Sequence, residues 1–447
     1  MILPDFPAEA TSLLLALAPA FTAPTFRRCV TLLGAALLTT GRHTVANLLR
    51  TVGATAPGHR TTYQRFLSAA SWSALHLACL LTRFVLRHLI PTGVVPLVGD
   101  DTVDGHKGKK VYGKARHRDA VRSSHRYTAY RYGHKWVVLA VLVRFPFATR
   151  PWALPVLVDL YRSAEENRRR RRPHRTPAQI LCKLLRVMLL WFPQRTFQFV
   201  GDSGYGTHAV ARFCQRHRAR LALVSKLHPQ ANLYEPPPPY RGQGRPRVKG
   251  PALPKPAQSA AAGRRQRLTV AWYGGGRRRV EVVSGQGHWY KSGAGLVALR
   301  WVFVHDLTGT HRDEYFYSTD LALKPAALIA AYTARWNIET TFEEMRAYLG
   351  LETTRGWCEK TVLRAAPCLF GLYTIVALLY QALPPAKRTA QLSWPGKHGV
   401  TFSDALTAVR RWLWAEWVFP QAEGGTAIEK LPPPVKDLIF SVLAPAA

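Results

Sequence analysis

The segment Tyr332-Thr-Ala-Arg-Trp-Asn-Ile-Glu-Thr-Thr-Phe-Glu-Glu-Met-Arg346 has the spacing of an amphipathic helix. At about 100° of rotation per residue, one phenol, one carboxylate and two guanidinium groups fall within a stripe roughly 60° wide, beside an apolar stripe. Such a polar face suits a phosphodiester, because arginine binds phosphate and glutamate can hold a metal ion. The same spacing is also typical of a helix whose polar face only meets water. The residues of the polar stripe are Tyr332, Arg335, Glu339 and Arg346.

Two further acids follow apolar runs of strand length. Asp101 comes after Val94–Val98, and Asp202 comes after Thr196–Val200, each beside a glycine-containing turn. Acids at strand ends lie at the open edge of a sheet, where α/β folds bind their ligands. Aspartate is equally common as a cap of turns and helix starts, so position alone leaves both interpretations open.

The middle of the chain predicts an α/β fold. Three consecutive apolar runs of strand length are followed by alternating helical and strand patterns, which indicates a mixed sheet with helices on its faces. Pro96 lies inside the first run, where a central strand would lose one donor. The expected strands are Val94–Val98, Trp136–Phe145, Trp152–Leu160, Thr196–Val200 and Leu221–Ser225, and the expected helices between them are Pro177–Trp191 and Thr207–His217.

The composition changes along the chain divide it into five expected regions. Residues 1–90 are predicted to be helical and to form either a helix-turn-helix-like DNA reader or an ordinary helical bundle. Residues 91–228 and 311–385 are the two parts of the sheet-containing core, the second with the Glu339 helix. Residues 229–310 are a β-rich insertion that begins with a Pro/Gly/Arg linker. Residues 386–447 form a helical C-terminal region.

The net charge of the chain indicates which class of molecule it binds. The chain has 62 Lys and Arg against 26 acids, a formal charge of +36 and a pI near 10.7. Such a field attracts a polyanion, and nucleic acid is the expected one. Six scattered cysteines without a Cys-x-x-Cys pair argue against a zinc site and against a disulfide framework, as in a reducing cytoplasm. The uncharged stretch 365–386 is long enough for a membrane span, but its prolines favour a buried core helix in a soluble protein.

The acidic motifs together resemble a known family. Asp100-Asp-Thr102, Gly201-Asp-Ser-Gly-Tyr-Gly206 and the Tyr332–Arg346 helix are similar to the DDE transposases of bacterial insertion sequences. They resemble in particular the group with a Tyr-x2-Arg-x3-Glu-x6-Lys signature, with Arg346 standing where that group has lysine. The resemblance covers roughly residues 60 to 360.

The resemblance implies an RNase H-like catalytic core, interrupted by a β-rich insertion before the final catalytic helix. It also implies that Asp101, Asp202 and Glu339 are the catalytic acids and the ligands of two Mg²⁺ or Mn²⁺ ions. Asp101 is preferred over Asp100 as the first ligand, because the family's motif places its aspartate directly before threonine. Two such ions would activate the attacking oxygen and stabilise the leaving oxygen of an in-line displacement.

The same resemblance suggests DNA contacts. Tyr332 and Arg335 would contact DNA near the transposon end, and Arg346 would bind phosphate. The basic residues Lys107, Lys109 and Lys110 follow the first acid closely and either grip DNA phosphate or form a solvated loop.

The expected function is therefore a cut-and-paste DNA transposase. It would act on the terminal inverted repeats of its own element and on target DNA, as a homodimer in the DNA complex, in the cytoplasm at the bacterial nucleoid. Two alternatives remain open at this point. One is a metal-dependent nuclease or resolvase with the same fold, and the other is a catalytically inactive, basic DNA-binding protein.

Overall fold

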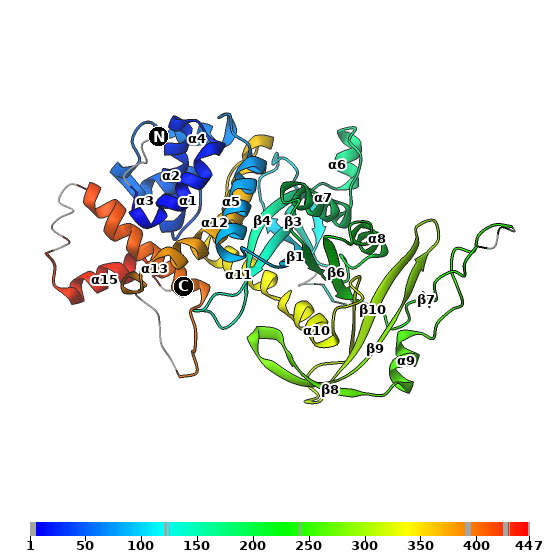
Figure 1. The fold of residues 1–447 in the computed structure, drawn as a ribbon. Helices are drawn as coiled ribbons and strands as arrows, with labels where there is room; N and C mark the ends of the chain where they lie inside the picture. The colour runs from blue at the N-terminus through cyan, green and yellow to red at the C-terminus, as the bar shows by residue number, and fades with distance from the viewer. Residues whose placement is uncertain are drawn as a thin grey trace.

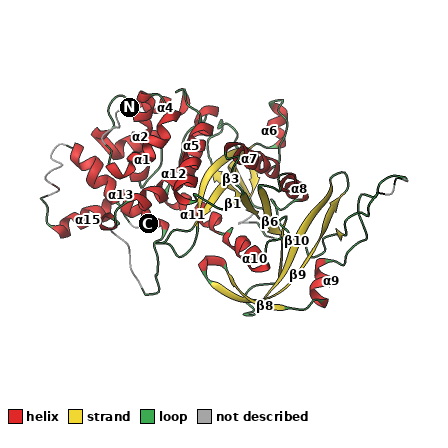
Figure 2. Cartoon of the chain, in the orientation of Figure 1, coloured by secondary structure: helices red, strands yellow, loops and turns green. Residues whose placement is uncertain are grey.

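A computed structural model describes residues 6–119, 123–124, 126–240, 242, 244–388, 395–422, 428 and 430–445. A helical region with both chain ends lies on one side of a central sheet, and a β-rich arm extends from the other side (Figure 1). Coloured by secondary structure, the helices of the two chain ends gather at one end of the molecule, and the longest strands lie at the other, with further helices beside the strands (Figure 2). Asp101 and Asp202 lie in or next to the central sheet, and Glu339 lies on a helix that packs against it.

The helical region combines the two ends of the chain. Helices α2 and α4 of the N-terminal part pack against α13 and α12 of the C-terminal part, so both ends share one core. Several of these helices begin at a side-chain cap, such as Thr44 before α3 and Ser73 before α5. The helices are α1 (Thr11–Leu17), α2 (Ala23–Leu38), α3 (Val45–Val52), α4 (Arg60–Ser68), α5 (Ala74–Leu89), α12 (Glu359–Ala382), α13 (Phe402–Leu413) and α15 (Pro433–Leu443).

The central sheet is mixed, as the sequence predicts. Its neighbouring strands run in the order β4-β3-β1-β5-β6; β1 is antiparallel to β3 and β3 to β4, whereas β1, β5 and β6 are parallel. This arrangement confirms the predicted α/β class with an RNase H-like mixed sheet. The strands are β1 (Val95–Gly105), β3 (Tyr130–Val143), β4 (Trp152–Tyr161), β5 (Phe197–Gly201) and β6 (Leu221–Lys226), with the short β2 (Ala115–Arg118) paired to the start of β3.

Helices cover both faces of this sheet. On one face lie α7 (Pro177–Trp191), which begins with a Thr176 capping box, and α8 (His208–Arg216). On the other face, α11 (Asn337–Tyr348) and α12 pack against β4 (Figure 1). The hydroxyls of Thr341 and Thr374 donate to backbone carbonyls of β4 at 2.9 and 2.7 Å, which fixes both helices on that strand. The small helix α6 (Ala164–Arg169) follows β4.

The β-rich insertion lies between β6 and α10 (Pro325–Ala334) and is dominated by a long hairpin of two strands. Its last strand pairs antiparallel with β6, so the insertion and the central sheet form one continuous sheet of eleven strands. The elements are β7 (Leu233–Tyr234), α9 (Pro256–Ala262), β8 (Gln266–Ala271), β9 (Arg277–Lys291), β10 (Gly295–Asp306) and β11 (Glu314–Ser318).

Helix α12 contains most of the uncharged stretch that raised the question of a membrane span. Among the described residues it is the one helix long and apolar enough to cross a bilayer, but 72% of its most apolar window is buried inside the protein. It contacts β4, α13 and α5 along its length. These contacts are those of a core helix.

Candidate active site

The two aspartate motifs lie where the parallel pairing between β1 and β5 ends, although β1 itself continues to Gly105. The last residue pair between β1 and β5 is Gly99 with Gly201, so Asp100 and Asp202 each follow that pair by one residue. Two acids distant in the sequence are thereby placed beside each other where β5 ends.

Asp100 and Asp101 point to opposite faces of the sheet, because side chains alternate along a strand. Gly99 marks one face: a Cβ added there would lie 2.8 Å from the side chain of Leu181 on α7, so glycine allows this helix to approach the strand. Asp101 is two residues further along and shares the α7 face. Asp100 lies on the other face, towards α10 and α11.

Arg335 joins Asp100 to Glu339. Its Nη1 atom lies 2.9 Å from Oδ2 of Asp100, and its Nη2 atom lies 2.6 Å from Oε1 of Glu339. The Arg335 side chain is only 11% exposed. The Asp100 carboxylate on β1 and the Glu339 carboxylate on α11 therefore lie close enough for one largely buried guanidinium to contact both.

Asp101 has different partners. Its Oδ1 atom forms an ion pair with Lys135 Nζ at 2.8 Å, and its Oδ2 atom accepts a hydrogen bond from the hydroxyl of Tyr205 at 2.8 Å. Lys135 comes from β3, two residues before the strand partner of Asp101. The charge of Asp101 is thus balanced on the face opposite Arg335 and Glu339.

A tight turn after β5 fixes Asp202. Its Oδ1 atom accepts the backbone N–H of Tyr205 at 3.1 Å, and its carbonyl accepts the backbone N–H of Gly206 at 2.7 Å and the Ser225 hydroxyl at 2.8 Å. A Cβ on Gly206 would lie 2.1 Å from the Ser225 hydroxyl, so the turn requires glycine there. Because Tyr205 also binds Asp101, this turn connects two of the three aspartates.

The electrostatics of the site centre on Asp100. Burial raises the pKa of this carboxyl to about 7; Arg335 opposes the rise, and the negative charges of Asp202 and Asp101 add to it. Burial acts to lower the pKa of Arg335, but Asp100, Tyr332 and Glu339 outweigh it and raise the pKa above its ordinary value. The site therefore holds more negative charge than its one arginine neutralises.

The predicted continuous helix from Tyr332 to Arg346 is wrong in one respect. The helix is divided into α10, which ends at Ala334, and α11, which begins at Asn337. Around the junction the backbone bonds span three residues, as from Arg335 N–H to the Tyr332 carbonyl at 3.1 Å, and the amide of Asn337 caps the Ala334 carbonyl at 2.8 Å. This tighter turn changes the angular spacing, so the four polar residues do not form one stripe.

Tyr332 lies inside the protein. It is 2% exposed, and its ring stacks on Phe316 of β11 with centroids 4.3 Å apart. Burial and nearby acids raise the pKa of its phenol. This packing leaves Tyr332 no surface for a DNA phosphate, contrary to the role that the resemblance implies.

Arg346 and the basic loop are more accessible. Arg346 is one-third exposed, pairs with Glu352 at 3.1 Å and contacts the hydroxyl of Thr102 on β1. Lys107, Lys109 and Lys110 are all exposed in the loop that follows β1. Arg346 lies on α11 against Thr102 of β1, one residue past Asp101, and the three lysines lie in the loop after β1.

Sequence reasoning missed two residues of the site, Lys135 and Tyr205. Tyr205 is part of the Gly201–Gly206 motif, but the sequence predicted no function for it. Lys135 is found only through the register of β1 with β3, which single-sequence patterns do not supply.

Two family models match this chain. A family model described as "DDE superfamily endonuclease" matches residues 16–279, more than half of the chain. The chain belongs to this family of DDE superfamily endonucleases. A second family model, described as "Archaeal putative transposase ISC1217", matches residues 296–371, the part that contains Glu339. The protein is a DNA transposase with a DDE endonuclease core; the finer group with a Tyr-Arg-Glu-Lys signature stays a prediction.

Other comparisons are more distant. A cryo-EM structure of a piggyBac transposase synaptic complex with hairpin DNA is similar over 99% of this chain and 82% of that chain, with 9% identity and a TM-score of 0.43. That likeness is too remote to carry an argument. A search of curated proteins gives no match.

Proposed function

We propose that this transposase cuts and joins the ends of its own insertion sequence with metal ions held by Asp100, Asp202 and Glu339. The observation that supports the proposal is the bridge from Arg335 to both Asp100 and Glu339, at 2.9 and 2.6 Å, beside Asp202. This set differs from the one implied by the resemblance, which has Asp101 first. Asp101 is our second choice, because it faces Lys135 and Tyr205 instead.

The donor set fits hard divalent cations. Carboxylate oxygens are the ligands that Mg²⁺ prefers, and Mn²⁺ accepts the same set. Burial, with the charges of Asp202 and Asp101, raises the pKa of Asp100, and cations bound between the acids would stabilise its charged form. When bound, two such ions supply an activated attacking oxygen and stabilise the leaving oxygen.

The chain's own residues hold this geometry. The turn of Tyr205 and Gly206 fixes Asp202, and Lys135 neutralises Asp101 so that its charge is not added in full to the metal-binding face. Arg335 keeps Glu339 turned towards β1. Such supports matter because displacement by a fraction of an ångström weakens metal-assisted chemistry.

Exposed basic side chains near the carboxylates are the residues that we expect to position the DNA. Arg346 lies on α11 beside Thr102 of β1, and Lys107, Lys109 and Lys110 lie in the loop after β1, where they would bind phosphates beside the scissile bond. We infer that the DNA partners are the terminal inverted repeats of the element and then target DNA. Joining two ends calls for two active sites, so we expect a homodimer in the DNA complex, acting at the bacterial nucleoid.

The test is a cleavage assay with linear DNA that carries the element's own ends. Cutting at the ends is expected with Mg²⁺ or Mn²⁺, and is expected to stop with EDTA or in Glu339→Gln. A DNA of equal length with scrambled ends is the matched control.

Two results would contradict the proposal. Metal-dependent cutting of both DNAs without preference for the ends supports the nuclease or resolvase alternative. Salt-sensitive binding without any cutting supports an inactive DNA-binding protein.

A further inference from the structure

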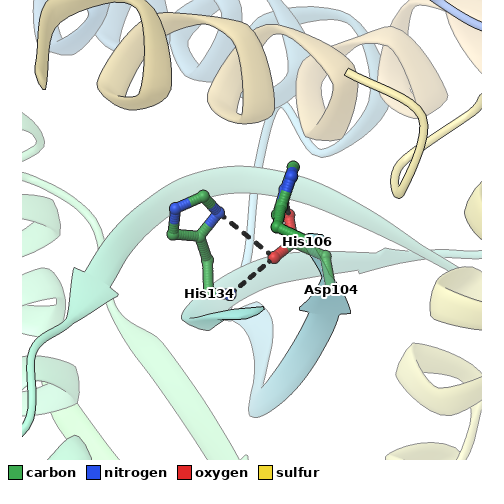
Figure 3. Close-up of side chains that lie close together, drawn as sticks. All are labelled: Asp104, His106 and His134. Atoms are coloured by element: carbon green, nitrogen blue, oxygen red, sulfur yellow. Dashed lines mark hydrogen bonds and ion pairs between the residues drawn. The ribbon is translucent and has the colours of Figure 1, made fainter. Parts of the chain in front are cut away.

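A second cluster of potential metal ligands lies on β1 beyond the carboxylate site. It consists of Asp104 near the end of β1, His106 just after it and His134 on β3, directly opposite Asp104 (Figure 3). One ligand atom from each residue lies within 4.8 Å of the others. The side chains are 1%, 7% and 2% exposed, respectively, so the cluster is almost entirely buried.

The distances suit a small cation with tetrahedral ligands. Oδ2 of Asp104 lies 3.3 Å from Nε2 of His106, and Oδ1 of Asp104 lies 3.3 Å from Nδ1 of His134. Zinc bonds of about 2.0–2.1 Å at tetrahedral angles separate neighbouring ligand atoms by roughly 3.4 Å. The two distances involve different oxygens of Asp104, and all three ligand atoms lie within 4.8 Å of one another, so rotation of these side chains would bring them around one ion.

The contacts around His134 define which of its nitrogen atoms is available. Its Nε2 atom lies 2.9 Å from the carbonyl oxygen of Tyr112, and a carbonyl only accepts, so Nε2 carries the hydrogen. In the neutral ring, Nδ1 then presents its lone pair to the Asp104 carboxylate, a repulsive arrangement unless a cation lies between them. A histidine ligand held through its other nitrogen by a backbone carbonyl is the usual arrangement in metal sites.

Asp104 is held in the same way by groups that are not ligands. Its Oδ1 atom accepts the backbone N–H of His134 at 2.9 Å, and its Oδ2 atom accepts the indole N–H of Trp136 at 3.1 Å. These bonds orient the carboxylate towards both imidazoles.

We propose that Asp104, His106 and His134 bind one zinc ion that joins the end of β1 to β3. Two imidazoles with one carboxylate favour zinc over magnesium, which prefers oxygen ligands throughout. Three protein ligands leave the fourth position to water. The cysteine pattern argued against zinc, but this site uses no cysteine. The zinc site is separate from the carboxylate site and does not depend on the proposed function.

The experiment measures metal in the full-length protein. Chelator-treated wild-type protein is dialysed against micromolar Zn²⁺ with excess Mg²⁺, and zinc is counted by atomic emission. One zinc per chain is expected for the wild type and a nearly complete loss for His106→Gln, the most exposed ligand. In the wild type, Co²⁺ in place of zinc should give the strong visible absorption of a tetrahedral site.

Two controls separate this site from other histidines and from the catalytic acids. His208→Gln removes another buried imidazole, and Glu339→Gln removes a proposed Mg²⁺ ligand; both variants should keep one zinc. Circular dichroism checks that each variant folds.

Three outcomes would overturn the proposal. Wild-type protein without bound zinc, and with an unfolding temperature that zinc does not raise, means that the cluster is only an ion-pair network. Zinc that persists in a folded His106→Gln variant, or that is lost in Glu339→Gln, belongs to another site. If His106→Gln does not fold, the zinc count and the Co²⁺ spectrum of the wild type decide.

Discussion

The Arg335 guanidinium lies 2.9 Å from the Asp100 carboxylate, although 235 residues separate the two in sequence. The contact joins the short turn between α10 and α11 to the middle of β1. Because the same guanidinium also binds Glu339, it orients two of the three acids that we propose as metal ligands.

Replacing Arg335 with lysine tests this orientation. Lysine keeps the positive charge, but its single nitrogen lacks the planar fork with which Arg335 binds Asp100 and Glu339 through two separate nitrogen atoms. We expect cleavage of the element's ends to fall on the order of 10²-fold, since small misplacements of catalytic groups cost about this much. Binding of the same DNA, measured by fluorescence anisotropy without metal, should be nearly unchanged. Equal loss of binding and cleavage would contradict a positioning role.

Asp100→Asn and Asp101→Asn are a matched pair on adjacent positions of one strand. The geometry predicts that Asp100→Asn abolishes metal-dependent cleavage, because it removes a proposed ligand on the Glu339 face. Asp101→Asn should keep measurable cleavage, because it removes the partner of Lys135 and Tyr205. The measurement is the single-turnover cleavage rate of each variant at several Mn²⁺ concentrations. Loss of cleavage in Asp101→Asn, with cleavage kept in Asp100→Asn, would restore Asp101 as the first ligand.

Lys109 and Lys110 should contribute to DNA binding through phosphate contacts. For the double variant Lys109→Gln/Lys110→Gln, the slope of log K against log salt should become shallower by about 0.9 per lost contact. The control is Arg216→Gln/Arg218→Gln, which removes two exposed charges at the end of α8. This helix runs back from the site end of β5 to the start of β6, so its last residues lie at the far end of the sheet. An equal change in both double variants would indicate nonspecific attraction alone.

We expect Tyr332 to stabilise the fold through its packing on Phe316, without contacting DNA. Tyr332→Phe keeps the ring that stacks on Phe316, so DNA affinity and stability should change little. Tyr332→Ala leaves a buried cavity and should lower the free energy of unfolding by about 3 kcal/mol or more. Urea denaturation of both variants measures this difference. A large loss of DNA affinity in Tyr332→Phe, without loss of stability, would instead point to the contact that the family resemblance implies.

Local patterns predicted much of the fold. The helix Pro177–Trp191 was predicted with its observed bounds, because a capping threonine, a proline in the first turn and an apolar stripe agree there. The proline in the first strand, Pro96, lies outside the β1–β3 pairing, which begins at Leu97, so it breaks no bond of that ladder. The strand β11 was missed, since five residues with two tyrosines have no clear alternation.

The site could be predicted only in part. The acids were found from their positions after strands, but the choice between Asp100 and Asp101 depends on which face each side chain takes. That face follows from tertiary contacts, such as Leu181 against Gly99, which no short-range pattern contains. The break at Arg335 was missed for a similar reason. The contacts that accompany it, with Asp100 and with the Ala334 carbonyl, are set by the packing of α10 and α11 on the sheet.

The pairing of β11 with β6 has a mechanical consequence. The arm formed by β9 and β10 is tied to the strand beside β5 through unbroken backbone ladders, so it cannot swing as an independent module without breaking hydrogen bonds. Any force on the tip of the arm would be transmitted as twist through the sheet. Asp202, at the end of β5, lies directly in the path of that deformation.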